Sequence, residues 1–185
     1  GYWDCTFDNG GNGGGRYLLE SMESGVGSYD QRKSARIDQL LEWAEVRDLK
    51  VMMAIWTHPF LRISGVPWSD GRWYDKNPYS RIVEPEAFFT DSLAQSYQDK
   101  HHRYMIARWG YSRALGIWEI INEAHGTTGW VKNQTETKAW VERVHGYFKE
   151  NDPFNRPTTA SFGAGDGASH FTDSDKLGDM PNIHF

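Results

Sequence analysis

Apolar positions along the chain fall into two alternating patterns. After Tyr29-Asp30, apolar residues fall at helical spacing from Ile37 onwards with charged residues between them, which predicts an amphipathic helix. Six consecutive apolar residues follow over 51–56, and such a run predicts a strand buried on both faces. The apolar positions of this helix are Ile37, Leu40, Leu41 and Ala44. The first half of the chain therefore predicts a helix followed at once by a strand.

The same alternation continues towards the C-terminus. The further expected elements are a helix over 88–113, a strand over 116–122, a helix over 135–150 and short strands over 158–162 and from 183. Strands that alternate with helices predict a parallel sheet with helices outside it. We expect an α/β fold, a partial (β/α)8 TIM barrel, and an open doubly wound sheet is the alternative.

The length supports one domain that is part of a barrel. A full barrel takes typically about 250 residues, whereas this chain has 185. It begins with Gly1 instead of Met and ends at Phe185 within an expected strand. We therefore expect residues 1–185 to form a single (β/α)-barrel catalytic domain, truncated at both ends.

Residues with chemical potential stand at the ends of successive expected strands, and this placement favours the barrel. In such barrels the C-terminal ends of the strands carry the active site. Residues 2–7 could be the end of a first strand, which would precede the strand over 51–56. The residues so placed are then Asp4, His58, Asn122, Glu123 and His184. Glu123 suits a general acid/base, because a half-buried site sets the pKa of a carboxyl group there. The plainer interpretation is that Asn-Glu begins a loop and that His58 is structural.

Composition narrows the classes of partner and cofactor. A net charge of −5 with mixed signs argues against nucleic acid as the main partner. Cys5 is the only cysteine, so an internal disulfide is excluded and a cysteine metal site is not expected. No apolar run is long enough to cross a membrane. We expect no metal and no organic cofactor.

A long segment over 59–86 joins the second expected strand to the next helix. It is rich in Pro and Gly, and loops of this length are commonly functional. Its aromatic residues include Trp68 and Trp73. Their rings could stack on the faces of sugar rings, or they could pack the loop against the barrel.

Four short segments in this order resemble one enzyme clan. They are Asn77-Pro78-Tyr79, Phe88-Phe89-Thr90-Asp91, Ala107 to Ser112, and Trp118-Glu119-Ile120-Ile121-Asn122-Glu123. Together they resemble the clan of retaining β-glycosidases with (β/α)8 barrels, in particular the cellulases and β-mannanases of glycoside hydrolase family five. The resemblance extends from about the second to the start of the sixth barrel strand.

The resemblance implies roles for individual residues. Glu123 would be the general acid/base, and Asn122 would hydrogen-bond the sugar 2-hydroxyl group. Substrate-binding positions would be His58, His184 and Trp3, together with Trp68 and Trp73 of the long loop. For Glu119 we expect an ion pair inside the barrel.

The sequence departs from the clan in one respect that matters for catalysis. The clan's nucleophile is a second Glu on the seventh strand, and we expect it outside this chain. The expected function is a retaining endo-β-glycosidase that hydrolyses a β-linked polysaccharide such as β-glucan or mannan. The alternative is a non-catalytic carbohydrate-binding protein on a glycosidase-like barrel.

Partners and location follow from the same resemblance. The expected partner is a β-linked oligo- or polysaccharide, with no nucleic acid and no membrane. A second chain that completes the barrel is a further candidate partner. The resemblance also implies an extracellular or periplasmic location.

Overall fold

A five-stranded parallel sheet organises the molecule. The computed structural model describes residues 3–4, 19–63, 73–163 and 177–184. The strands pair in sequential order, all parallel. They are β1 (Trp3–Asp4), β2 (Val51–Thr57), β3 (Leu115–Asn122), β4 (Thr158–Gly163) and β5 (Met180–His184). This arrangement confirms the α/β prediction.

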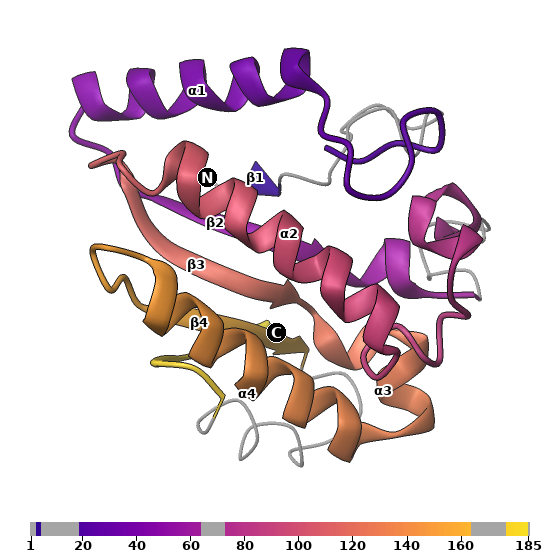
Figure 1. Ribbon diagram of the computed structural model, residues 1–185. Helices are drawn as coiled ribbons and strands as arrows, with labels where there is room; N and C mark the ends of the chain where they lie inside the picture. Colours follow the sequence, from indigo (N-terminus) through magenta and orange to yellow (C-terminus); the bar gives the residue numbers. More distant parts are fainter. Residues whose placement is uncertain (1–2, 5–18, 64–72, 164–176, 185) are drawn as a thin grey trace.

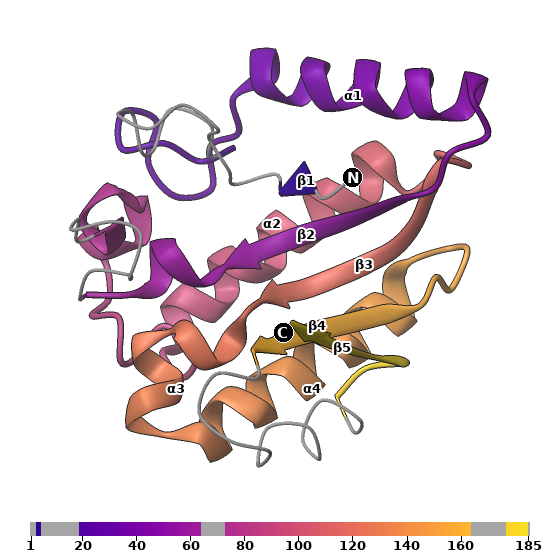
Figure 2. The ribbon, with the colours of Figure 1, turned by 180° about the vertical axis from the view of Figure 1, so that it is seen from behind.

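Helices cover one face of this sheet in the part of the chain that the structure describes. The α-helices are α1 (Gln31–Val46), α2 (Ser92–Trp109), α3 (Thr128–Lys132) and α4 (Gln134–Asn151). Figures 1 and 2 show α1, α2 and α4 on one side of the strands, whereas α3 lies beyond their C-terminal ends. A doubly wound sheet carries helices on both faces and reverses its strand order. The sequential order and one-sided cover therefore match a section of a barrel wall.

Short 3-10 helices shape the molecule at the C-terminal ends of the strands. They are η1 (His58–Leu61), η2 (Trp73–Lys76), η3 (Pro78–Arg81) and η4 (Ala124–Gly126). η1 begins directly after β2, and η4 begins one residue after β3. The chain thus turns tightly at the C-terminal ends of both central strands, which keeps their last side chains close to the sheet.

The boundaries of the helices follow from their caps. The sequence predicts the second helix from residue 88, but α2 begins at Ser92 because the Asp91 side chain accepts a hydrogen bond from the Ala94 N–H at 2.8 Å. Asp30 caps α1 in the same way, with the N–H groups of Arg32 and Lys33 as donors.

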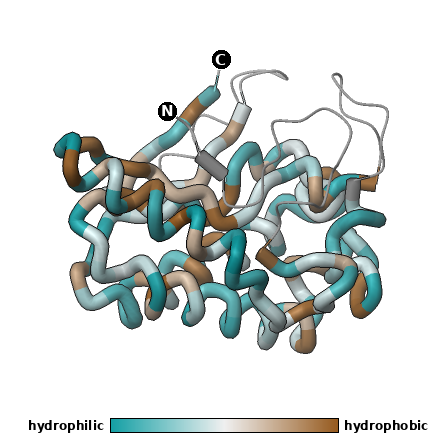
Figure 3. Tube along the Cα trace, turned by 90° about the horizontal axis from the view of Figure 1, so that it is seen from above, coloured by the Kyte–Doolittle hydropathy of each residue, from teal (hydrophilic) through white to brown (hydrophobic). Residues whose placement is uncertain are grey.

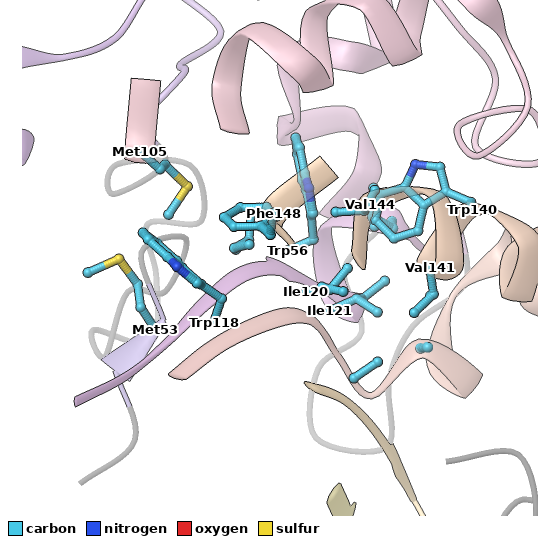
Figure 4. Packing of buried hydrophobic residues seen from close by; sticks show 14 of the residues in the cluster. Met53, Trp56, Met105, Trp118, Ile120, Ile121, Trp140, Val141, Val144 and Phe148 are labelled. Carbon is cyan, nitrogen blue, oxygen red and sulfur yellow. The ribbon is translucent and has the colours of Figure 1, made fainter. Parts of the chain in front are cut away.

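The hydrophobic core lies between the sheet and its helices. Figure 4 shows buried residues of β2 and β3 beside those of α2 and α4 in one continuous cluster. The Trp118 ring packs on Phe148 at 5.1 Å between ring centroids, and the Trp56 indole N–H donates to His102 Nε2 at 3.0 Å. His101 and His102 of α2 are buried by this packing. Burial of these aromatic rings fixes the strands against the helical layer.

The outer surface of the helical layer is polar. Figure 3 shows hydrophilic residues along most of the outermost turns, as amphipathic helices over a core require. Among the described residues, no helix is long and apolar enough to cross a membrane.

Candidate active site

The site is built at the C-terminal ends of β2, β3, β4 and β5. Thr57 and Asn122 are partners in the β2–β3 pairing, and Gly163 and His184 are partners in the β4–β5 pairing. Because all strands are parallel, their ends meet at one edge of the sheet. The residues that follow these ends are therefore brought together.

Glu123 adopts a backbone conformation that is unusual for its residue type. Its φ of 53° and ψ of 55° lie in the left-handed region, which non-glycine residues seldom occupy. The Glu123 N–H donates to the Ser161 hydroxyl oxygen at 2.8 Å. Such conformations cost on the order of 1–3 kcal/mol and gather at functional sites. The left-handed turn ends β3 and directs the chain into η4.

The Glu123 carboxylate lies between two imidazole rings. Oε1 is 2.9 Å from His184 Nδ1, and Oε2 is 3.3 Å from His58 Nδ1. His58 comes from the end of β2 and His184 from the end of β5, so three strands contribute to this cluster. His58 is almost fully buried, whereas the side chains of Glu123 and His184 keep partial access to solvent. A ligand could therefore reach the carboxylate from the open side.

The two imidazoles differ in their proton affinity. The hydrogen bond to Glu123 raises the pKa of His184, against the opposing effect of its burial. Burial lowers the pKa of His58 to about 4, because desolvation outweighs the attraction of the Glu123 carboxylate. The same hydrogen bond from His184, with a smaller attraction from His58, lowers the pKa of Glu123. At neutral pH Glu123 is thus a carboxylate beside a neutral His58.

Asn122 is held by neighbours on three sides. Its Nδ2 group donates to the Ser161 hydroxyl oxygen at 3.0 Å and to Glu119 Oε1 at 3.4 Å. Its Oδ1 accepts a long hydrogen bond from the Thr57 hydroxyl at 3.5 Å. The long bonds are weak, so a ligand hydroxyl can replace either of them without breaking the short one to Ser161.

Glu119 is completely buried within this network. Its Oε1 accepts hydrogen bonds from the side-chain amides of Asn122 and Asn182, each at 3.4 Å. Its charge contributes to the raised pKa of His184. The contacts seen here are with amide groups, and the expected ion pair of Glu119 inside the barrel stays a prediction.

Sequence reasoning did not single out Ser161, Asn182 or His125. The hydroxyl of Ser161 and the amide of Asn182 stand within short strands, where nothing in the sequence distinguishes them. His125 Nδ1 accepts the Gly163 N–H at 2.8 Å, which ties η4 to the end of β4. The one signal in the sequence that His125 belongs to the site is its position two residues after Glu123.

Three predicted substrate-binding residues remain predictions. Trp68 lies outside the described residues, and so do the side chains of Trp3 and Trp73. The backbones of Trp3 and Trp73 belong to β1 and η2. The structure therefore brings together Glu123, Asn122, His58 and His184 of the predicted set.

The described ranges contain no cluster of side chains suited to a metal ion. Within them, no three His, Cys, Asp or Glu side chains are grouped so that they could hold a metal ion. At the candidate site, the Nδ1 atoms of His58 and His184 each lie near a different oxygen of the Glu123 carboxylate.

The fold of this chain is similar to that of several solved structures. No protein-family model and no curated protein matches the chain. Solved structures of endo-glycoceramidase II from Rhodococcus sp. do match 77% of it: a cellobiose-like isofagomine complex with a TM-score of 0.51 at 16% identity, and a ganglioside GM3 complex with a TM-score of 0.50 at 16% identity. A further structure of endo-glycoceramidase II has a TM-score of 0.50 at 18% identity.

The matches cover only part of the endo-glycoceramidase chains. The chain spans about two fifths of the length of the endo-glycoceramidase chains, 39% of the first and 38% of the other two. At this level of identity the likeness shows the fold. The chain has the fold of a partial (β/α)8 barrel, as the sequence predicts.

Proposed function

We propose that this chain belongs to a retaining glycoside hydrolase of the family five clan, and that Glu123 is its general acid/base. The observation that carries the proposal is Glu123 itself. A left-handed backbone turn at the end of β3 holds its carboxylate between His58 and His184. If this position had only a structural role, Gly or Asn would suit it better than Glu, because both adopt the left-handed conformation at lower cost.

The proposed reaction uses two carboxyl groups. Glu123 donates its proton to the glycosidic oxygen as the bond to the sugar C1 breaks, and a second carboxylate outside this chain forms a covalent bond to C1. Glu123 then takes a proton from water, which attacks C1 and releases the second carboxylate. A general acid/base at one residue serves both steps because the first leaves it ionised for the second.

The substrate we propose is a β-linked glycan. The matching structures of endo-glycoceramidase II include complexes with a ganglioside and with cellobiose-like ligands. We extend only the class of ligand, an oligosaccharide with β-linked units, to this chain. β-Glucan and mannan are the specific candidates, on the basis of the sequence resemblance.

One observation favours the alternative of carbohydrate binding without catalysis. The His184 hydrogen bond lowers the pKa of Glu123, whereas a general acid must carry a proton before it reacts. An ionised carboxylate suits the acceptance of hydrogen bonds from sugar hydroxyls. In the catalytic proposal, a second carboxylate about 5–5.5 Å away raises the pKa of Glu123 through like-charge repulsion.

The substitution Glu123→Gln, made in the complete protein that supplies the second carboxylate, tests the proposal against this alternative. We expect it to lower kcat for methylumbelliferyl β-cellobioside, β-mannobioside or β-lactoside by about 10²–10⁴-fold, the usual contribution of a general acid/base. Glu142→Gln, on the exposed side of α4, is the matched control and should retain full activity. Unchanged turnover in the Glu123 variant would refute the catalytic role. Sugar-induced changes in tryptophan fluorescence, without hydrolysis by the unsubstituted protein, would establish the binding alternative.

A further inference from the structure

Ser161 lies beneath the candidate site, near the end of β4, and is completely buried. Its hydroxyl oxygen accepts the Glu123 N–H at 2.8 Å and the Asn122 Nδ2–H at 3.0 Å. A hydroxyl oxygen has two lone pairs, so these two bonds use its whole capacity as an acceptor. Ser161 thus hydrogen-bonds both members of the Asn-Glu pair.

The bond to the Glu123 backbone acts where the chain is under conformational strain. A left-handed residue persists only when its surroundings fix it, and Glu123 has this conformation directly after the last residue of β3. The Ser161 hydroxyl satisfies the N–H group that the turn removes from the strand ladder. The side-chain direction of Glu123 follows from this backbone conformation.

A second contact from β4 restrains the same segment two residues later. The Gly163 N–H donates to His125 Nδ1 at 2.8 Å. A Cβ atom on Gly163 would lie 2.5 Å from His125 Cε1, so only glycine permits this close approach. β4 therefore holds residues 122–125 at two points, and only the contact through Ser161 depends on a side chain of β4.

We propose that Ser161 is a positioning residue for Glu123, and this inference rests on the proposed function. The hydroxyl fixes the left-handed turn and thereby sets which Glu123 oxygen faces His184 and which faces His58. It also orients the Asn122 amide through the same oxygen. Loss of the hydroxyl releases the turn, and the carboxylate then leaves the position from which it would protonate a glycosidic oxygen.

Leaving-group dependence separates this role from a general loss of structure. A misplaced general acid slows substrates whose leaving group needs a proton, whereas a 2,4-dinitrophenolate leaves without one. For Ser161→Ala we expect kcat/KM to fall about 10²-fold on a methyl or methylumbelliferyl β-glycoside, as for a misplaced catalytic group. On the matching dinitrophenyl β-glycoside it should fall less than about threefold. Ser161→Cys, with nearly the same volume and a weaker acceptor, should lie between.

A matched control is available in the same strand. Thr159 is also buried, but its hydroxyl donates to the Met180 carbonyl oxygen at 2.7 Å instead of contacting the Asn-Glu pair. Thr159→Val removes a buried hydroxyl of β4 and should leave the ratio of the two rates unchanged. Equal losses on both substrates in the Ser161 variants, or no loss, would overturn the proposal.

An NMR titration of His184 decides the inference even if no glycoside is hydrolysed. The groups that raise the pKa of His184 are Glu123, by its hydrogen bond, and Glu119. If Ser161 positions Glu123, the pKa of His184 falls in Ser161→Ala and stays in place in Thr159→Val. An unchanged pKa in Ser161→Ala would refute the positioning role. Absence of hydrolysis by the unsubstituted protein would refute only the proposed function.

Discussion

Two imidazoles share the Glu123 carboxylate and differ in their proton affinity. His184 Nδ1 donates to Glu123 Oε1 at 2.9 Å, and this hydrogen bond raises the pKa of His184. His58 Nδ1 lies 3.3 Å from Glu123 Oε2, and burial lowers the pKa of His58 to about 4, so that His58 is neutral at pH 7. The carboxylate therefore lies in an asymmetric environment, with the His184 hydrogen bond as the largest cause of its lowered pKa.

The buried state of His58 has a consequence for stability. Its pKa falls from 6.5 to about 4 on folding, so between these values the unfolded chain binds a proton that the folded chain does not. Stability therefore decreases as pH falls through this window. His58→Gln should reduce that slope by up to about 1.4 kcal/mol per pH unit, as measured by urea unfolding at pH 7, 5.5 and 4.5.

His102 supplies the control for this measurement. Burial lowers its pKa to about 4 as well, and it lies in α2 beside Trp56. His102→Gln should flatten the same window without altering the pKa of His184. A His58 variant with the slope of the unsubstituted protein would show that His58 is protonated in the folded state.

At this scale the sequence predicts the residues of the candidate site better than the residues that support them. Glu123, Asn122 and His58 follow apolar runs directly, so their place at strand ends could be inferred. Ser161 could not, because a hydroxyl within a strand of mixed character carries no sign of the turn that it meets 38 residues earlier in the chain. The left-handed conformation of Glu123 is likewise set by that distant contact.

At the scale of elements, a buried ion pair joins the end of α4 to the start of β3. Asp152 Oδ1 accepts from Arg156 Nη1 at 2.9 Å, and Arg156 also donates to the carbonyl oxygens of Ser112 and Leu115 at 2.8 and 2.7 Å. Both side chains are buried. The Trp118 indole N–H donates to the same carboxylate group at 3.1 Å. This turn fixes the N-terminal edge of the sheet, opposite the site.

Removal of the guanidinium group should therefore be costly. Arg156→Ala leaves the Asp152 carboxylate buried without its cation, and we expect a loss of about 3–5 kcal/mol in the free energy of unfolding. Arg113→Ala removes an exposed arginine 3.8 Å from Glu45 and should cost no more than about 1 kcal/mol. Denaturant unfolding of both variants checks the difference. Similar losses in the two variants would contradict the account.

The periodicity predicts these elements but not all of their ends. The third helix, expected over 135–150, forms over Gln134–Asn151. The second was expected to begin at residue 88 and begins at Ser92, because the Asp91 cap competes with continued apolar spacing. The short helices α3 and η4 were not expected, since segments of five and three residues carry no periodic pattern.

At the scale of the molecule, the parallel strands collect side chains from distant parts of the sequence at one edge. His58 and His184 are more than a hundred residues apart, yet both contact Glu123. Alternation of strands and helices was sufficient to predict this edge. On this arrangement we base the proposal that Glu123 protonates the leaving group of a β-glycoside and then activates water.

Azide rescue of a Glu123→Ala variant tests this claim most directly. Small anions can enter the space left by the carboxylate and attack a glycosyl-enzyme intermediate without help from a general base. The measurement is the rate on a 2,4-dinitrophenyl β-glycoside with and without azide, with NMR assignment of the product. We expect acceleration by azide and a β-glycosyl azide as the product. An α-glycosyl azide would assign Glu123 as the nucleophile, and no acceleration or azide product would contradict the acid/base role.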